Sequence, residues 1–176
     1  MTSQARLDAL TQLLDLDGLE VVDVDEDRVR MVRRLGVMPT VDVGVCPQCR
    51  RSTDHRHQVR EHTVQDLPWG RYATQLAIRL PQYQCPHCGA VFTPSCPMLA
   101  EGAHATERFL ERLAEMVRWS DLKNAAAFFG LPEKTLEHWY YAYVARRQTS
   151  VPSAPIRSLG IDELARKKNA GVSAAC

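Results

Sequence analysis

The sequence has no uninterrupted apolar run that approaches the roughly eighteen residues of a membrane-spanning helix. It does not open like a signal peptide either, because acidic residues interrupt the apolar positions of MTSQARLDALTQLLDLDG. A large excess of one charge is also missing, since the 176 residues carry a formal net charge of +1. These absences argue against a membrane protein and against a strongly cationic chain, and they favour a cytosolic protein.

The near-neutral sum conceals a charge gradient along the chain. Residues 1–45 carry a net charge of −4, residues 46–103 carry +2, residues 104–150 carry +1 and the remainder carries +2. An acidic first segment therefore leads into a mildly basic remainder. Such a modest excess could neutralise only a few phosphates, so any DNA binding should be weak without dimerisation or further domains.

Two C-x-x-C elements, CPQC at 46–49 and CPHC at 85–88, are the strongest chemical signal. In a reducing compartment, paired cysteines indicate a metal rather than disulfides. Two such knuckles supply four thiolates for one tetrahedral ion and leave no position for water, so we expect a structural Zn²⁺. A redox motif and plain buried cysteines are the alternatives. The predicted ligands are Cys46, Cys49, Cys85 and Cys88, whereas Cys96 and Cys176 are expected to be bystanders.

Hydrophobic periodicity predicts an α+β protein. Leucines at spacings of three and four predict a short helix over 5–15. Extended segments are expected over 19–25, 28–35 and 40–45. Strict alternation over 71–84 predicts a strand that pairs with 56–65 across a turn at 66–70. This hairpin would bring the two knuckles side by side, as in a zinc ribbon.

Helical patterns begin at Thr106, a predicted N-cap, and Ser120 is the predicted cap of a second helix that ends at Gly130. Residues 122–141 fit a helix-turn-helix, with Ala126 as the small residue at the helix contact. A DNA-reading second helix would present Lys134, His138 and Tyr141 outward, with Arg146 and Arg147 near phosphates. A three-helix bundle that merely packs is the alternative.

These patterns divide the chain into five expected parts. They are an N-terminal α+β cap (1–45), a four-cysteine zinc-ribbon domain (46–103), a helix-turn-helix domain (104–147), a linker (148–158) and the start of another domain (159–176).

The order of these parts resembles the N-terminal half of transposases of the ISL-three insertion-sequence family. The resemblance covers about residues 5–168 and rests on the two CPxC elements, DLPWG between them, YQCPHCGAVFTPSC, the helix-turn-helix and LGIDELARKK. It implies that the zinc finger and the helix-turn-helix bind the terminal inverted repeats of a transposon in double-stranded DNA. It further implies an RNase H-like domain in which Asp162 would match the first of three DDE acids that hold two Mg²⁺ ions.

After LARKK the chain departs from that family and ends in NAGVSAAC. One aspartate cannot position two metal ions about 4 Å apart, so we expect Asp162 to be a non-functional relic and the chain to be a truncated transposase without its own catalysis. The expected setting is the bacterial nucleoid, with a second copy or full-length transposase as a further partner. Two alternatives stay open: an enzyme whose catalytic half comes from elsewhere, and a zinc-ribbon protein-interaction or transcription-regulator module unrelated to transposition.

Overall fold

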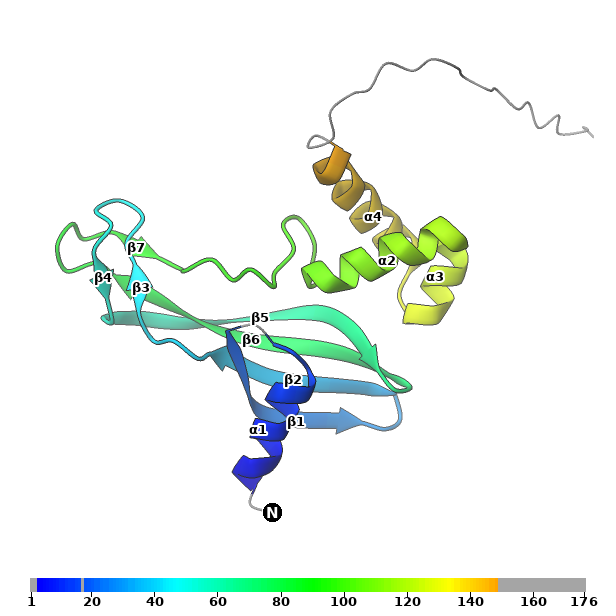
Figure 1. The fold of residues 1–176 in the computed structure, drawn as a ribbon, viewed down its shortest axis with the longest axis horizontal. Coiled ribbons are helices and arrows are strands. Elements are labelled where there is room, and N and C mark those ends of the chain that lie inside the picture. Colours follow the sequence, from blue (N-terminus) through cyan, green and yellow to red (C-terminus); the bar gives the residue numbers. More distant parts are fainter. Residues whose placement is uncertain (1–2, 17, 149–176) are drawn as a thin grey trace, which may run out of the picture.

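The computed structural model describes residues 3–16 and 18–148 (Figure 1). Helices and strands are both present, which confirms the predicted α+β class. In chain order the elements are α1 (Ser3–Leu13), β1 (Leu19–Asp27), β2 (Val32–Pro39), β3 (Gly44–Val45), β4 (Ser52–Thr53), β5 (Arg56–Trp69), β6 (Tyr72–Gln84), β7 (Val91–Phe92), α2 (Glu107–Trp119), α3 (Leu122–Phe129) and α4 (Glu133–Gln148). None of the helices within these residues has the length and apolar character needed to cross a membrane.

One sheet joins the N-terminal strands to the long hairpin, in the order β1-β2-β6-β5, with β7 paired to β6. The pairs β1–β2 and β5–β6 are antiparallel, whereas β2 and β6 run parallel, with Leu35 opposite Leu76. The segments predicted as a cap (1–45) and a zinc-ribbon domain (46–103) therefore share a single sheet. Parallel strands need a long crossover connection. The connection from β2 to β6 is of this kind, and it contains the first knuckle and β5, so the zinc-ribbon segment pairs directly with the N-terminal strands.

The sheet has one buried face and one polar face. The buried core consists of residues from the sheet and from the segments around it: Leu16, Leu19, Val21, Leu35, Val37, Val64, Leu76, Ile78, Leu80 and Met98. Leucines of α1 pack against this core, as their spacing of three and four predicted. On the other face Arg79 contacts Asp23 (2.8 Å) and Glu61 (3.4 Å), and Arg34 pairs with the same glutamate. The alternation of apolar and charged residues thus separates core from solvent.

The predicted strand over 28–35 is wrong at its start, because residues 28–31 form a turn. The Asp27 carboxylate accepts hydrogen bonds from the backbone N–H groups of Val29 (3.0 Å) and Arg30 (2.9 Å), and Met31 has φ 55°. Val29 is 94% exposed, as expected for a turn at the end of the sheet. The alternation of polar and apolar residues over 28–31 is also typical of a strand. The hydrogen bonds from backbone N–H groups to the Asp27 side chain instead stabilise a turn.

Two neighbouring predictions also needed adjustment. The turn expected at 66–70 is shorter, because β5 continues to Trp69 and Gly70 (φ 64°) supplies the reversal. The strand expected at 40–45 is present only at Gly44–Val45.

The helical part follows the sequence signals more closely. The Thr106 hydroxyl accepts from the Phe109 N–H (3.2 Å), which confirms the predicted cap of α2. The cap of α3 is Asp121, not Ser120, because its carboxylate accepts from the Asn124 N–H (2.7 Å). A carboxylate is as good a cap as a hydroxyl and adds a favourable charge at the helix start.

A left-handed residue ends α3, as the glycine predicted. Gly130 has φ 66° and donates its N–H to the Ala126 carbonyl. The fully buried small residue of α3 is Ala125, and the predicted contact residue Ala126 is partly buried and also packs against the helical core. Around it lies a second core, made chiefly of Phe109, Leu110, Leu113, Phe129, Leu136, Trp139 and Tyr143.

Candidate metal centre and helical face

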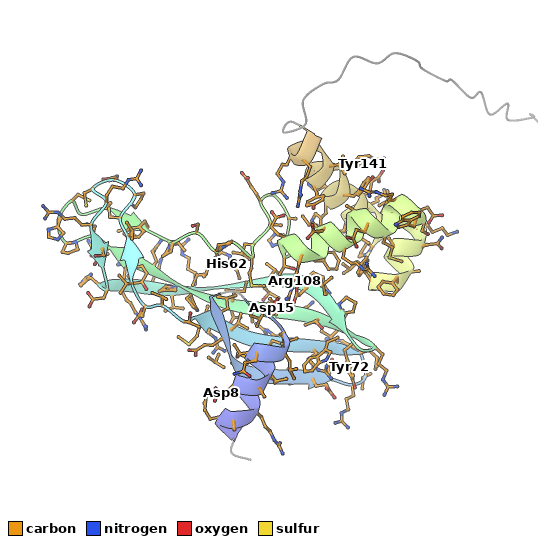
Figure 2. The ribbon with its side chains drawn as sticks, viewed as in Figure 1. Asp8, Asp15, His62, Tyr72, Arg108 and Tyr141 are labelled. Atoms are coloured by element: carbon orange, nitrogen blue, oxygen red, sulfur yellow. The ribbon has the colours of Figure 1, made fainter. Side chains whose placement is uncertain are left out.

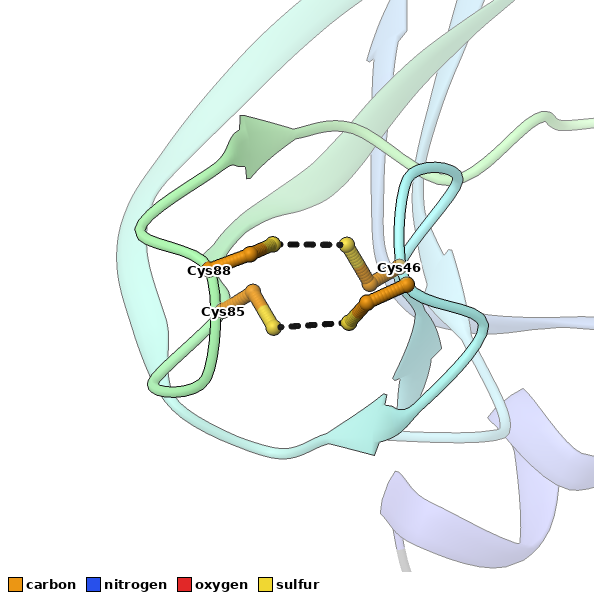
Figure 3. Close-up of side chains that lie close together, drawn as sticks. Cys46, Cys85 and Cys88 are labelled. Carbon is orange, nitrogen blue, oxygen red and sulfur yellow. Dashed lines mark hydrogen bonds between the residues drawn. The ribbon is translucent and has the colours of Figure 1, made fainter.

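The two knuckles lie side by side and direct four cysteines to one point (Figure 3). The Sγ atoms of Cys46 and Cys88 are 3.6 Å apart, those of Cys49 and Cys85 are 3.5 Å apart, and all four lie within 4.8 Å of one another. Sulfurs around a tetrahedral zinc, with Zn–S bonds of about 2.3 Å, are separated by about 3.8 Å. The donor set and its spacing therefore fit one four-coordinate ion.

Each knuckle is closed by the same two backbone hydrogen bonds. Cys46 donates to the Arg51 carbonyl and accepts from the Arg50 N–H, both at 2.9 Å. Cys85 likewise donates to Ala90 (2.8 Å) and accepts from Gly89 (2.9 Å). The residue after each knuckle has positive φ, 60° at Arg50 and 75° at Gly89. The arginine adopts this conformation at a cost of about 1 kcal/mol, so the first knuckle is the more strained.

Short strands and an aromatic pair support the knuckles. The first knuckle joins β3 to β4, and the second joins β6 to β7. Tyr83 and Phe92 pack with the buried Cys46 and Cys85. A Cβ at Gly44 would lie 2.7 Å from the Tyr83 ring, so only glycine permits the close approach of β3 to this small core.

Backbone N–H groups favour thiolates at the first cysteine of each knuckle. Those of Cys88 and His87 lower the pKa of Cys85 to about 6, and those of Cys49 and Gln48 lower the pKa of Cys46. At Cys88 the Ala90 N–H also lowers the pKa, but burial and the other three sulfurs outweigh it and raise the pKa to about 12. Converging negative charges oppose one another, so a cation is required before all four sulfurs can ionise.

No other grouping of potential ligands occurs between residues 3 and 148, apart from position 17, which the structure does not describe. Cys96 packs against the sheet core, where burial raises its pKa, which agrees with a bystander. Cys176 and Asp162 lie outside the described residues. His87 is exposed and contacts the Arg51 guanidinium across the two knuckles, with 2.9 Å between Nη1 and Nδ1.

The α3–α4 pair presents part of the predicted DNA-contact set to solvent. Lys134, His138 and Tyr141 are exposed and recur at spacings of four and three, so they share one face of α4. Figure 2 labels Tyr141 on this helix. Arg146 and Arg147 instead lie against α2: the first pairs with Glu107 (2.9 Å) and the second approaches Glu111 (3.8 Å). These two arginines thus connect α4 to α2.

Sequence reasoning missed the joint between the sheet and the helices. Asp66 on β5 is 1% exposed and accepts hydrogen bonds from the Thr106 hydroxyl (2.7 Å) and from the Arg108 Nε (2.8 Å). Gln65 completes the joint, because its N–H donates to the His104 carbonyl and its carbonyl accepts from Thr106. No local pattern could have indicated contacts between residues about forty positions apart.

Comparisons with known proteins agree with a metal site at the four clustered cysteines. Residues 42–88 match the family described as zinc-finger of transposase IS204/IS1001/IS1096/IS1165. Over 151 residues the chain is 25% identical to the transposase for insertion sequence element IS1001 of Bordetella parapertussis. No solved structure matches.

These findings show a chain that is similar to insertion-sequence transposases and that contains a stretch similar to their zinc finger, and they confirm the predicted resemblance. The aligned region is 86% of this chain and 37% of the Bordetella protein. The chain therefore spans little more than a third of the length of the curated relative.

Proposed function

We propose that this chain is a DNA-binding portion of an insertion-sequence transposase and that it recognises the terminal inverted repeats of the element. The observation that carries the proposal is the coincidence of the four-cysteine cluster with the stretch that matches transposase zinc fingers. Binding to transposon ends is the role such a segment would have in a protein of that kind.

The metal in this proposal is a structural Zn²⁺ held by Cys46, Cys49, Cys85 and Cys88. The two knuckles belong to separate strand pairs with little core between them, since only Tyr83 and Phe92 are buried there besides cysteine. An ion that joins the knuckles would supply the stability that so small a core lacks.

The α3–α4 pair is the proposed reading element. With α4 in a major groove, Lys134, His138 and Tyr141 would face base edges or nearby phosphates. Arg147 remains mostly exposed at the far end of α4 and can reach a phosphate, whereas Arg146 primarily connects α4 to α2. The acidic Glu133 and Glu137 on the same helix would limit non-specific binding.

We further propose that the described segment contributes binding and not phosphoryl transfer. Transfer by DDE enzymes needs carboxylates that converge on two metal ions. In residues 3–16 and 18–148 the only convergent set of ligands is the cysteine cluster. Mg²⁺ would belong to a catalytic domain outside the described segment.

The test is fluorescence anisotropy of the zinc-loaded chain with a fluorescent duplex of the inverted repeat and with a shuffled duplex of equal length. We expect the inverted repeat to bind at least about tenfold more tightly, a modest ratio for specific over non-specific DNA binding. His138→Ala should reduce the preference without unfolding the chain, because this side chain is exposed. Equal affinities for the two duplexes would refute recognition of the repeats.

A protein partner is a second candidate function, favoured by two exposed aromatic residues. Trp119 at the end of α2 is 87% exposed and Phe128 of α3 is 62% exposed, and both border one groove. Large exposed aromatic side chains are enriched at protein interfaces. Sedimentation of the DNA-free chain would test self-association: a dimer that Trp119→Ala dissociates supports this candidate, and a monomer at high concentration opposes self-association.

A further inference from the structure

Two turns of the sheet meet at one end of the molecule. Because β2 and β6 are parallel neighbours, with Val32 opposite Ala73, the turns that precede them lie at the same end of the sheet. A hydrogen bond from the Ala73 N–H to the Met31 carbonyl (3.0 Å) connects the two turns directly. The β1–β2 turn and the β5–β6 turn therefore form a single tip.

This tip lies beside the end of α3 (Figure 1). A cleft of about 390 Å³ separates them. Arg30, Met31 and Arg71 line it on the sheet side, and Phe128 and Gly130 line it on the helical side. The helical wall is thus the same glycine turn that leads into α4, which begins only three residues later at Glu133.

The two arginines on the sheet side of the cleft form weak ion pairs, or none, with acids of the described part of the chain. Arg30 is mostly exposed and comes no closer than 3.9 Å to Asp27, whose other carboxylate oxygen accepts the backbone hydrogen bonds of the turn. Arg71 is exposed and forms no ion pair with an acid in the described part of the chain. The nearby Glu26 is already engaged by Arg28 and Arg33.

A guanidinium held near the start of a groove-reading helix suits one ligand in particular, the sugar–phosphate backbone. A duplex that receives α4 in its major groove must pass one strand along the turn before that helix. Arginines favour phosphate because their planar fork can donate two hydrogen bonds to it. Such contacts fix register and add affinity without reading sequence.

We propose that Arg30 and Arg71 bind backbone phosphates of duplex DNA beside the groove that α4 enters, so that the tip of the sheet is part of the DNA interface. This inference rests on the proposed function of α4. It gives the N-terminal strands a role in binding, because the β1–β2 turn supplies one of the two cations.

The experiment measures DNA affinity of the zinc-loaded full chain against salt concentration, for the inverted repeat and for a shuffled duplex. Each lost phosphate contact makes the slope of log K against log salt less steep by about 0.9. At 0.1 M salt, relative to 1 M, this corresponds to about an eightfold loss of affinity. The double variant Arg30→Ala/Arg71→Ala should therefore lose about 60-fold in affinity for both duplexes and keep the preference between them. Arg71→Lys should retain most of the slope.

The matched control is Arg6→Ala, which removes an exposed cation from α1, outside the cleft. It should leave the slope unchanged, and circular dichroism should show all variants folded. A double variant with the wild-type slope would overturn the sheet-tip proposal while leaving recognition by α4 intact. Loss of slope in a chain that shows no preference for the repeat would support the phosphate surface and refute specific recognition. A wild-type chain that binds neither duplex would overturn both.

Discussion

The guanidinium of Arg108 and the carboxylate of Asp66 form a two-pronged salt bridge that ties the first turn of α2 to β5. The Arg108 Nε donates to Asp66 Oδ1 (2.8 Å), and a second nitrogen donates to Oδ2. The remaining Nη1 donates to the carbonyl of Leu14 (2.6 Å), just beyond α1. One side chain thus connects the N-terminal helix, the sheet and the helical part.

Replacing Arg108 with alanine should destabilise the fold strongly, because Asp66 would remain as a buried carboxylate without its countercharge. Breaking a buried pair from one side costs about 3–5 kcal/mol, and the partial exposure of Arg108 places the expected loss near the lower figure. Urea unfolding at neutral pH would measure it.

The control for that experiment is Arg112→Ala on the same helix. Arg112 is exposed and pairs with Glu115 within α2 (2.8 Å), so its loss should cost less than about 1 kcal/mol. Equal losses in the two variants would mean that the Asp66 pair does not join the sheet to the helices in solution.

Features with a local cause could be predicted from the sequence, and features with a distant cause could not. The spacing within each C-x-x-C fixes where two sulfurs point, and Gly130 is the residue type that tolerates φ 66°. The parallel pairing of β2 with β6 has no comparable local signal, because the residue pattern of a strand does not indicate which other strand it pairs with. The sheet tip and its paired arginines follow from that pairing, so they too were beyond sequence reasoning.

Cys85→Ser should abolish metal binding and unfold the two knuckles together with the short strands β3, β4 and β7, because these lie outside the main sheet core. Structural zinc contributes on the order of 10 kcal/mol to the folding of small domains, far more than two buried aromatic residues can replace. The zinc content of the purified chain should fall from one ion per chain to close to none, and limited proteolysis should cut within the two knuckles.

Cys96→Ser is the matched control, because this thiol packs against the sheet core and lies outside the four-sulfur cluster. It should retain one zinc and the wild-type cleavage pattern. If Cys85→Ser kept both its metal and its protease resistance, the four-cysteine assignment would be wrong.

Glu26 should contribute stability that is lost on acidification. The hydrogen bond from Arg33, helped by those from Arg28 and Tyr72, outweighs burial and lowers the pKa of Glu26 from its ordinary value of 4.5. A carboxyl group with a lowered pKa in the folded state stabilises the fold above its ordinary pKa, and this stabilisation disappears as the pH falls through the lower, folded value. Glu26→Gln should therefore be less stable than wild type at pH 7, with a gap that closes on acidification.

Urea midpoints for both chains, measured at several values between about pH 7 and pH 3, would test this linkage. A gap that stays constant over the whole range would show that the interactions of Glu26 do not depend on its charge.

Lys134 and Arg146 lie on the same helix, but we expect Lys134 to contribute to DNA affinity and Arg146 to contribute to the stability of the fold. Lys134 is exposed and makes no ion pair in the described part of the chain, so Lys134→Ala should leave the unfolding midpoint unchanged and weaken DNA binding. Arg146 pairs with Glu107 on α2 and lies near the Tyr143 ring, so Arg146→Ala should cost about 0.5–1 kcal/mol of stability, given its partial exposure. Its effect on the salt dependence of binding should be small. Parallel unfolding and anisotropy measurements separate the two roles, and a loss of DNA affinity in Arg146→Ala as large as in Lys134→Ala would return Arg146 to the phosphate-binding set.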